Sequence, residues 1–183
     1  MSLLKNDLHV AQPLHISLSR PLSLKTPQKD PFWLRLKQSI TETSVKSFEV
    51  NVTDLAWHPN ESKTRWFLVL RLQPSPPLHR LLESCNTIAR EFDQPLLYAE
   101  QDSRQEEVTF DHFHISIAWS LTPPQPPAPG EAGSRHVEVT SIPDGLLTRL
   151  KPLHIAFSDV KVRIGQDVHS IPLKPRRQST GLA

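Results

Sequence analysis

Two stretches of this chain, 99 positions apart, carry the same alternating pattern. Residues 15–19 read His-Ile-Ser-Leu-Ser, and residues 114–118 read His-Ile-Ser-Ile-Ala. Successive side chains of a β-strand point to opposite faces, so each histidine shares a face with the serine two positions later. The pattern therefore predicts two similar half-buried strands, one in each of two structurally similar lobes. The polar side chains that they present are His15 and Ser17 in the first stretch, and His114 and Ser116 in the second.

The composition is that of an ordinary globular protein. Hydrophobic residues make up 37% of the chain, charged residues make up 22%, and the net charge is +2. A length of 183 residues is a little more than one typical domain. No apolar run is long enough to cross a bilayer, and we find no signal-peptide pattern. We therefore expect residues 1–183 to form a single domain of two lobes, with no membrane partner.

Cysteine and glycine usage excludes several classes of protein. A single cysteine, Cys85, allows no intramolecular disulfide and no thiolate zinc site, and it fits a reducing compartment. The chain has only five glycines and contains neither GxGxxG nor GxxxxGK[ST]. These observations argue against a Rossmann enzyme and against a P-loop NTPase.

Apolar periodicity predicts two long helices. The first spans 31–43, with Asp30 as its N-cap and Pro31 at its first helical position. The second begins near Ser75 and ends at Gln94, and Cys85 lies on its apolar stripe, where we expect inert packing. The stripe consists of Leu78, Leu81, Leu82, Cys85, Ile88, Ala89 and Phe92.

Alternation and turn residues predict the remaining elements. We expect strands at 14–19, 47–57, 65–72, 113–121, 153–164 and 170–173, and a short helix at 142–150. The order β-α-β-β-α-β-α-β-β is typical of an α+β domain with antiparallel sheet. Five prolines lie between 123 and 129 in a chain that has 18. They predict an extended loop over about 122–136, which serves either as a variable linker or as an SH3-type ligand.

Two imidazoles and two hydroxyls that meet at one place suit the cleavage of a phosphodiester. One imidazole accepts the proton of an attacking oxygen while the other donates a proton to the leaving oxygen. An ordinary histidine pKa near 6.5 makes both roles available at neutral pH. The serines donate hydrogen bonds to the phosphoryl oxygens as charge develops. The structural alternative is a pair of exposed histidines on edge strands without a catalytic role.

The other histidines lack such a pattern. His154 has no hydroxyl two positions later, so we expect it to pack or to bond locally. His112 lies two residues before His114, but no third ligand has suitable spacing, and we expect no metal and no other cofactor. We assign no role to His58, His79, His136 or His169. Lys63, Arg65 and Trp66 follow a turn and either reach RNA phosphates or pack on the surface.

The paired H-x-S strings resemble the signature of the 2H phosphoesterase superfamily. More narrowly, the chain is similar to the U6 snRNA phosphodiesterase family over about residues 10–174. The resemblance rests on residues 15–19, on Glu-Ser-Lys-Thr-Arg at 61–65, on Phe-His-Ile-Ser-Ile-Ala-Trp at 113–119, and on Ser-Ile-Pro-Leu-Lys at 170–174. It implies a two-lobed, pseudo-symmetric α+β fold, with antiparallel sheets that flank a central cleft and helices outside.

By resemblance, the chain is an RNA phosphodiesterase, a metal-independent 3′→5′ exonuclease that trims the 3′ oligo(U) end of U6 snRNA. The product ends in a 2′,3′-cyclic phosphate or, after ring opening, in a 3′-phosphate. The resemblance makes His114 the general base and His15 the general acid, with Ser17 and Ser116 as phosphate-binding partners. It also implies that Tyr98 stacks on the terminal base, although the insertion at 100–109 and a half-buried core role argue against this.

The family resemblance further implies a nuclear location, a monomer, and the 3′ end of U6 snRNA as the partner. Two other functions stay open at this point. One is a 2H cyclic phosphodiesterase that acts on other 2′,3′-cyclic phosphates, and the other is a non-catalytic RNA-binding protein. The second of these predicts that His15 and His114 are dispensable.

Overall fold

The structure is a computed structural model that describes residues 3, 13–60, 62–98, 113–122 and 144–176. These residues form an α+β fold with antiparallel sheets, as predicted. Contacts divide the chain into two compact units. The first unit comprises Met1–Ser17, Asn51–Pro74 and Glu107–His154, and the second comprises Leu18–Val50, Ser75–Glu106 and Ile155–Ala183. The predicted proline-rich loop, except for its first residue, Thr122, lies outside the described residues.

Helix α1 (Lys29–Glu42) confirms the first predicted helix but begins earlier than expected. A short 3₁₀ helix, η1 (Thr26–Gln28), leads directly into it, and Gln28 takes the N-cap position that we predicted for Asp30. Pro31 consequently lies at the third helical position. Proline is tolerated there because the first backbone N–H groups of a helix have no intrahelical acceptor. Asp30, in the first turn, is favourable to the helix dipole.

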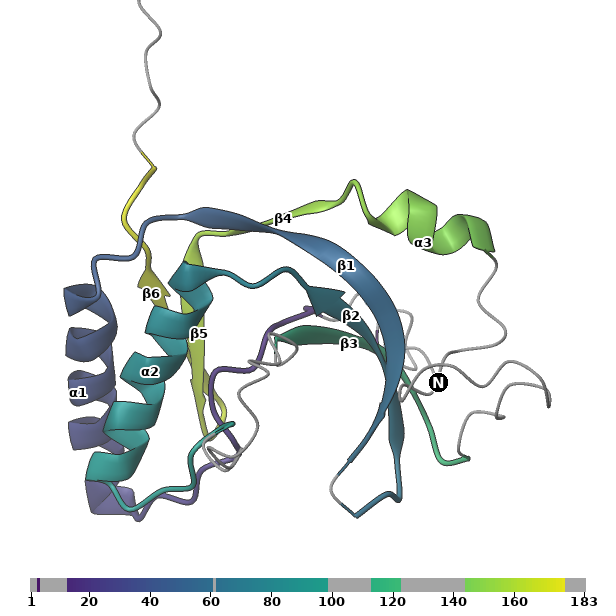
Figure 1. The fold of residues 1–183 in the computed structure, drawn as a ribbon. Coiled ribbons are helices and arrows are strands. Elements are labelled where there is room, and N and C mark those ends of the chain that lie inside the picture. Colours follow the sequence, from purple (N-terminus) through teal and green to yellow (C-terminus); the bar gives the residue numbers. More distant parts are fainter. Residues whose placement is uncertain (1–2, 4–12, 61, 99–112, 123–143, 177–183) are drawn as a thin grey trace, which may run out of the picture. The chain divides into compact units, whose positions relative to one another are not determined.

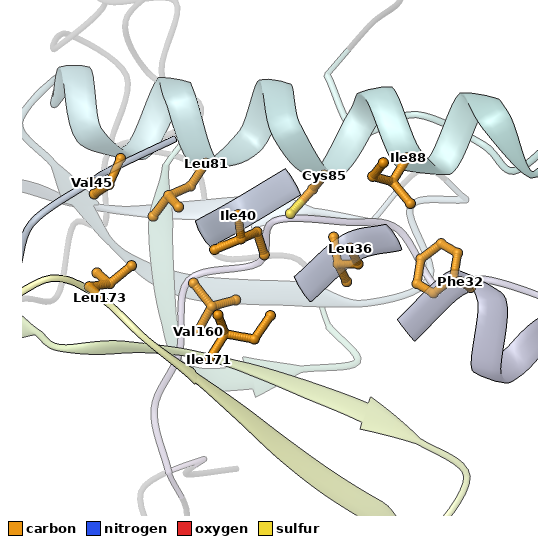
Figure 2. Close-up of a cluster of buried hydrophobic side chains, with 10 residues drawn as sticks. All are labelled: Phe32, Leu36, Ile40, Val45, Leu81, Cys85, Ile88, Val160, Ile171 and Leu173. Atoms are coloured by element: carbon orange, nitrogen blue, oxygen red, sulfur yellow. The ribbon is translucent and has the colours of Figure 1, made fainter. Parts of the chain in front are cut away.

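Helix α2 (Pro76–Glu91) matches the second predicted helix, and its apolar stripe forms part of the core of the second unit. Figure 2 shows Leu81, Cys85 and Ile88 pointing from α2 toward residues of α1 and of the chain segment 159–172. Leu81 and Ile88 are almost fully buried. Truncating such a leucine to alanine typically costs about 2–5 kcal/mol of stability. The buried members of this cluster are Phe32, Leu36, Ile40, Val45, Leu81, Cys85, Ile88, Val160, Ile171 and Leu173.

The larger sheet has four strands in the order β3-β2-β1-β4. β1 (Phe48–Pro59) pairs antiparallel with β2 (Trp66–Leu72), and β2 pairs antiparallel with β3 (His114–Ser120). The three run side by side in Figure 1. They confirm three predicted strands, although β1 continues to Pro59 and therefore includes His58, which the sequence placed in a turn. α3 (Asp144–Leu150) confirms the short helix.

Two predicted strands need correction. Residues 14–19 form only an isolated antiparallel bridge between Ile16 and Ile115, although their side chains do alternate between exposed and half-buried from His15 onward. The single strand predicted at 153–164 is two strands, β4 (His154–Phe157) and β5 (Asp159–Ile164). The break falls at Ser158 because β4 joins the larger sheet while β5 pairs with β6, and no glycine or proline marks that change in the sequence.

The smaller sheet is a tight hairpin of β5 and β6 (Asp167–Pro172). Ile164 pairs with Asp167, so two residues make the turn. The first of them is Gly165, whose φ of 64° lies in the left-handed region that such turns require. The hairpin buries Val160 and Ile171 in the core of the second unit. It also explains why β6 begins earlier than the strand predicted at 170–173.

Candidate active site

Strand pairing places several polar residues of the first unit on one face of the sheet. Phe67, Val69 and Arg71 alternate along β2 and share this face. Their partners on β3 are Trp119, Ser116 and His114, and their partners on β1 are His58, Ala56 and Asp54. We call this nine-residue surface the histidine face. The opposite face carries apolar pairs such as Leu55 with Leu70 and Leu70 with Ile115.

His114 and Ser116 are held on the histidine face by the buried residues between and beside them. Phe113 is 2% exposed and Ile115 is 3% exposed, whereas His114 and Ser116 are half-buried. The Leu72 N–H donates to the Phe113 carbonyl at 3.2 Å, which continues the pairing of β2 and β3. Because the apolar side chains are anchored in the core, the histidine and the serine are directed to the other side of the strand.

The bridge between Ile16 and Ile115 connects the two H-x-S strings. In an antiparallel pair, the residues that flank a bridge oppose each other, so this register sets His15 across from Ser116. It likewise sets Ser17 across from His114. His15 and Ser17 are both exposed, as expected of side chains on the outer side of a half-buried pair. Both H-x-S strings belong to the first unit.

A β-bulge alters the alternation of β3 beyond Ser116. Val69 pairs with Ser116 and Leu68 pairs with Ala118, so Ile117 is the extra residue. In a regular strand, Trp119 would face away from His114 and Ser116. The bulge instead puts Trp119 opposite Phe67 on the histidine face. The guanidinium of Arg65 lies over the Trp119 ring, 5.2 Å from its centroid, a cation–π contact that places a positive charge at this end of the face.

His58 and Arg71 are site residues that sequence reasoning missed. The rings of His58 and His114 are nearly parallel, with centroids 5.8 Å apart and an interplanar angle of 5°. Nη2 of Arg71 lies 3.2 Å from Nε2 of His58. Arg71 is only 9% exposed. The sequence did contain one indication for His58. It stands an even number of positions from Asp54 and Ala56, so the three side chains share a face if the segment is a strand. The adjacent proline instead suggested a turn.

Tyr98, the residue expected to stack on a base, belongs to the second unit. It is half-buried and has a φ of 59°, a left-handed conformation that is uncommon for a residue with a side chain. Burial raises the pKa of its phenol. The side chain of Asn86 holds the preceding residue, because its Oδ1 accepts from the Leu97 N–H at 3.0 Å and its Nδ2 donates to the Leu97 carbonyl at 2.9 Å.

Three described histidines remain, namely His79, His154 and His169. His79 and His154 are exposed, and His169 stacks on Trp33 in the second unit with centroids 4.6 Å apart. His112 and His136 lie outside the described residues. In the described part of the chain, no group of three or more His, Cys, Asp or Glu side chains is placed to hold a metal ion. None of its helices has the length and apolar character needed to span a membrane.

A polar hollow of about 380 Å³ lies along α2 and contains none of the predicted site residues. Its lining consists of His79, Leu82, Glu83, Asn86, Thr87 and Arg90. It is open to solvent, and all of its lining residues come from the single helix α2. The histidine face therefore remains the candidate active site.

The antiparallel α+β fold and the two connected H-x-S strings agree with the fold expected from the resemblance to the 2H phosphoesterases. Residues 1–172 match the family model HVSL, which is described as an uncharacterised conserved protein, and the chain belongs to this family. It is 36% identical over 132 residues to U6 snRNA phosphodiesterase 1 of Neurospora crassa, a match that covers 64% of this chain and 35% of that protein. The predicted resemblance to the U6 snRNA phosphodiesterase family is confirmed.

Two solved structures share the fold. Usb1 of Kluyveromyces marxianus superposes with a TM-score of 0.62 at 22% identity, and its structure with uridine monophosphate superposes with a TM-score of 0.64 at 19% identity. Each match covers 94% of this chain and 80% of the solved chain. At this level of identity, the similarity establishes the fold. The chain spans about a third of the length of the curated Neurospora relative that it matches.

Proposed function

We propose that this protein is an RNA phosphodiesterase that removes nucleotides from the 3′ end of U6 snRNA as a 3′→5′ exonuclease. The observation that carries the proposal is the antiparallel bridge between Ile16 and Ile115, because its register gives each histidine a serine from the other string. A relative that is 36% identical is named a U6 snRNA phosphodiesterase, and a fold neighbour was solved with uridine monophosphate. Both names support RNA as the substrate.

The proposed reaction is an internal transesterification. The 2′-hydroxyl of the penultimate nucleotide attacks the adjacent phosphorus, and His114 accepts its proton as general base. A bond forms between the 2′-oxygen and phosphorus while the bond from phosphorus to the 5′-oxygen of the terminal nucleoside breaks. His15 donates a proton to that leaving oxygen. The products are a terminal nucleoside and an RNA that is shorter by one nucleotide and ends in a 2′,3′-cyclic phosphate.

Ser17 and Ser116 stabilise the phosphoryl group in this proposal. Their hydroxyls donate hydrogen bonds to the non-bridging oxygens, which gain negative charge in the transition state. A second cycle with water as the nucleophile and with the histidine roles exchanged would open the ring to a 3′-phosphate. No metal ion or other cofactor takes part in either step.

The substrate contacts beyond the scissile phosphate follow from the family resemblance. We assign Tyr98 to stacking on the terminal base, which is worth about 1–3 kcal/mol per base. The preferred substrate is an oligouridylate 3′ end, the protein acts as a monomer, and its location is the nucleus. Arg65 on Trp119 supplies a cation at the edge of the histidine face that suits an RNA phosphate.

The test is incubation with a U6-like RNA that ends in oligouridylate, in the presence of EDTA, followed by mass analysis of the RNA ends. The proposal expects progressive shortening and ends that carry a cyclic phosphate or a 3′-phosphate. Hydrolysis of pre-formed 2′,3′-cyclic phosphates without shortening would instead identify a 2H cyclic phosphodiesterase. Binding without any change in length, unaffected by His15→Ala and His114→Ala, would identify a non-catalytic RNA-binding protein.

A further inference from the structure

Three residues from three neighbouring strands form a polar cluster on the histidine face. His58 comes from β1, Arg71 from β2 and His114 from β3. The His58 and His114 rings are 5.8 Å apart and tilted by only 5°, and Arg71 lies directly opposite His114 in the pairing of β2 and β3. Arg71 is 9% exposed and both histidines are half-buried, so the cluster is partly shielded from water.

The contact between Arg71 and His58 determines how His58 is protonated. A guanidinium has only N–H donors and keeps its proton at any pH a protein tolerates. Nη2 of Arg71 lies 3.2 Å from Nε2 of His58, so Nε2 must accept the hydrogen bond. An imidazole whose Nε2 accepts is neutral and carries its proton on Nδ1. Protonation of Nε2 would set two donors and two positive charges against each other at a shielded position.

Other charges near His58 are compatible with this assignment. On the histidine face, Asp54 lies opposite Arg71 in the pairing of β1 and β2 and offsets part of its charge. Arg65 contacts Trp119 at the far end of β2, and Lys63 lies in the exposed turn between β1 and β2. Among the described residues, His114 is a titratable group that stacks on the His58 ring. The positive charge of Arg71, whose Nη2 lies 3.2 Å from the ring, favours the neutral form of His58.

We propose that His58 is a positioning residue for His114, kept in its neutral Nδ1–H form by Arg71. Its flat ring packs against the imidazole of His114 and holds that imidazole in one plane. The inference rests on the proposed function, in which His114 moves a proton at the scissile phosphate. Rotation about the second side-chain torsion of histidine is otherwise broad, so a packed neighbour is what defines the ring plane.

The neutral state of the His58 ring matters as much as its shape. When His114 accepts a proton it becomes an imidazolium, and a neutral ring beside it adds no repulsion. A protonated His58 would place a second positive charge about 6 Å away, and two like charges repel more strongly at half-buried positions than in bulk water. A neutral His58 also offers the RNA no competing acid next to the general base. The cluster therefore allows one histidine to change its charge while its neighbour does not.

Three variants distinguish the role of the His58 ring from the role of its hydrogen-bond acceptor. His58→Ala removes both, His58→Phe keeps a flat ring without the acceptor, and His58→Gln keeps an acceptor without the ring. We expect kcat of His58→Ala to fall about 10- to 100-fold, with KM changed less than about twofold, because misplacing a reacting group by 1 Å can cost about 100-fold. His58→Phe should recover most of kcat, and His58→Gln should not.

Two kinetic results would overturn the proposal. One is a wild-type kcat in His58→Ala. The other is recovery by His58→Gln but not by His58→Phe, which would mean that His58 only satisfies Arg71 and has a structural role. His79→Ala is the matched control, because this exposed histidine lies in the second unit, and it should keep the wild-type kcat. Thermal unfolding of every variant identifies any loss of rate that comes from loss of fold.

The protonation of His58 is tested without any RNA. In protein labelled with ¹⁵N-histidine, the His58 signals, identified by their loss in His58→Gln, should show a protonated Nδ1 and an unprotonated Nε2. This pattern should persist through the range near pH 6.5 where an ordinary histidine titrates. Titration of His58 in that range, or a proton on Nε2, refutes the role of Arg71. If the wild type shortens no RNA while the tautomer is as expected, the proposed function fails and the tautomer assignment stands.

Discussion

Ile16 and Ile115 form an antiparallel bridge that connects segments almost a hundred residues apart in the sequence. Neither isoleucine has chemistry of its own. Their pairing nevertheless fixes the register of the two H-x-S strings, so that His15 opposes Ser116 and Ser17 opposes His114. The candidate active site thus depends on an apolar contact on the opposite side of the strand pair. The first two predictions below follow from that register.

Replacing either histidine of the two strings should abolish trimming while RNA binding persists. A general acid or base typically contributes about 10²–10⁴-fold, so His15→Ala and His114→Ala should each reduce kcat by that order. The measurement is the rate of shortening of a 3′-oligouridylate RNA, with binding followed separately by fluorescence anisotropy. His79→Ala serves as the control. Substantial turnover in the double variant His15→Ala, His114→Ala would contradict the mechanism.

Replacing the serines should have a smaller effect of a different kind. Loss of one donor to a developing oxyanion commonly costs about 10²–10³-fold in kcat. Ser17→Ala and Ser116→Ala should therefore reduce kcat without shifting the pH at which the rate is maximal, since a hydroxyl does not titrate in this range. Ser120→Ala, on the same strand as Ser116, is the matched control. An altered pH optimum in either serine variant would show that the serines act on the histidines instead of on the phosphate.

The buried thiol of Cys85 should make stability fall at high pH. Burial raises the pKa of this thiol from 9.0 to about 12. Between these values the unfolded chain loses the thiol proton and the folded chain keeps it. The free energy of unfolding should therefore decline above pH 9, by at most about 1.4 kcal/mol per pH unit from this group. Denaturant unfolding at several pH values, compared with Cys85→Ala, isolates this contribution because the variant lacks it.

The same burial should protect Cys85 from alkylation at neutral pH. The nucleophile is the thiolate, which is scarce when the pKa is about 12. We expect iodoacetamide to modify Cys85 only after denaturation, as followed by mass spectrometry. Rapid modification of the folded protein would show that the core between α1 and α2 opens readily. Such opening would also remove the basis for the predicted pH dependence.

The β5–β6 hairpin should be weakened at low pH. The Lys161 ammonium, 2.5 Å from the Asp159 carboxylate, and the Ser170 hydroxyl, which donates to it at 2.6 Å, lower the pKa of Asp159. The stabilisation is complete above the ordinary carboxyl pKa and is lost as the pH falls through the lowered value. Both charged side chains are partly exposed, so Asp159→Asn should cost less than about 1 kcal/mol at neutral pH.

Salt provides the control for this hairpin prediction. High ionic strength screens an exposed ion pair, so the difference between wild type and Asp159→Asn should shrink in about 1 M salt. Thermal unfolding at pH 7 and near pH 3, each at low and high salt, gives the comparison. An equal difference under all four conditions would mean that the substitution acts through packing and not through charge.

The helices and most strands could be predicted because their signals are local. The apolar stripe of α2 and the alternation of β2 each lie within one continuous segment. The break at Ser158 could not be predicted, because it depends on which sheet each half of the segment joins. The start of α1 was missed for a related reason. The preceding 3₁₀ turn supplies the N-cap at Gln28, although Asp30 and Pro31 form a stronger local signal.

The H-x-S strings were visible in the sequence because each is a short pattern, but their partners were not. His58 contacts His114 only because β1 and β3 are brought together on either side of β2. Arg71 carried no signal of its own, since an arginine in an apolar strand gives no indication of the histidine that it will meet. Both residues depend on long-range pairing, which no pattern within one segment encodes.

The extra residue at Ile117 makes the pairing of β3 as important as its composition. In a strand without the bulge, the same string in regular alternation would direct Trp119 to the far side of the sheet, although no letter of it would differ. An alignment that matches every letter would still score the motif as intact. A relative with this string therefore has the same face only if its strand also leaves one residue between the serine and the tryptophan out of the pairing.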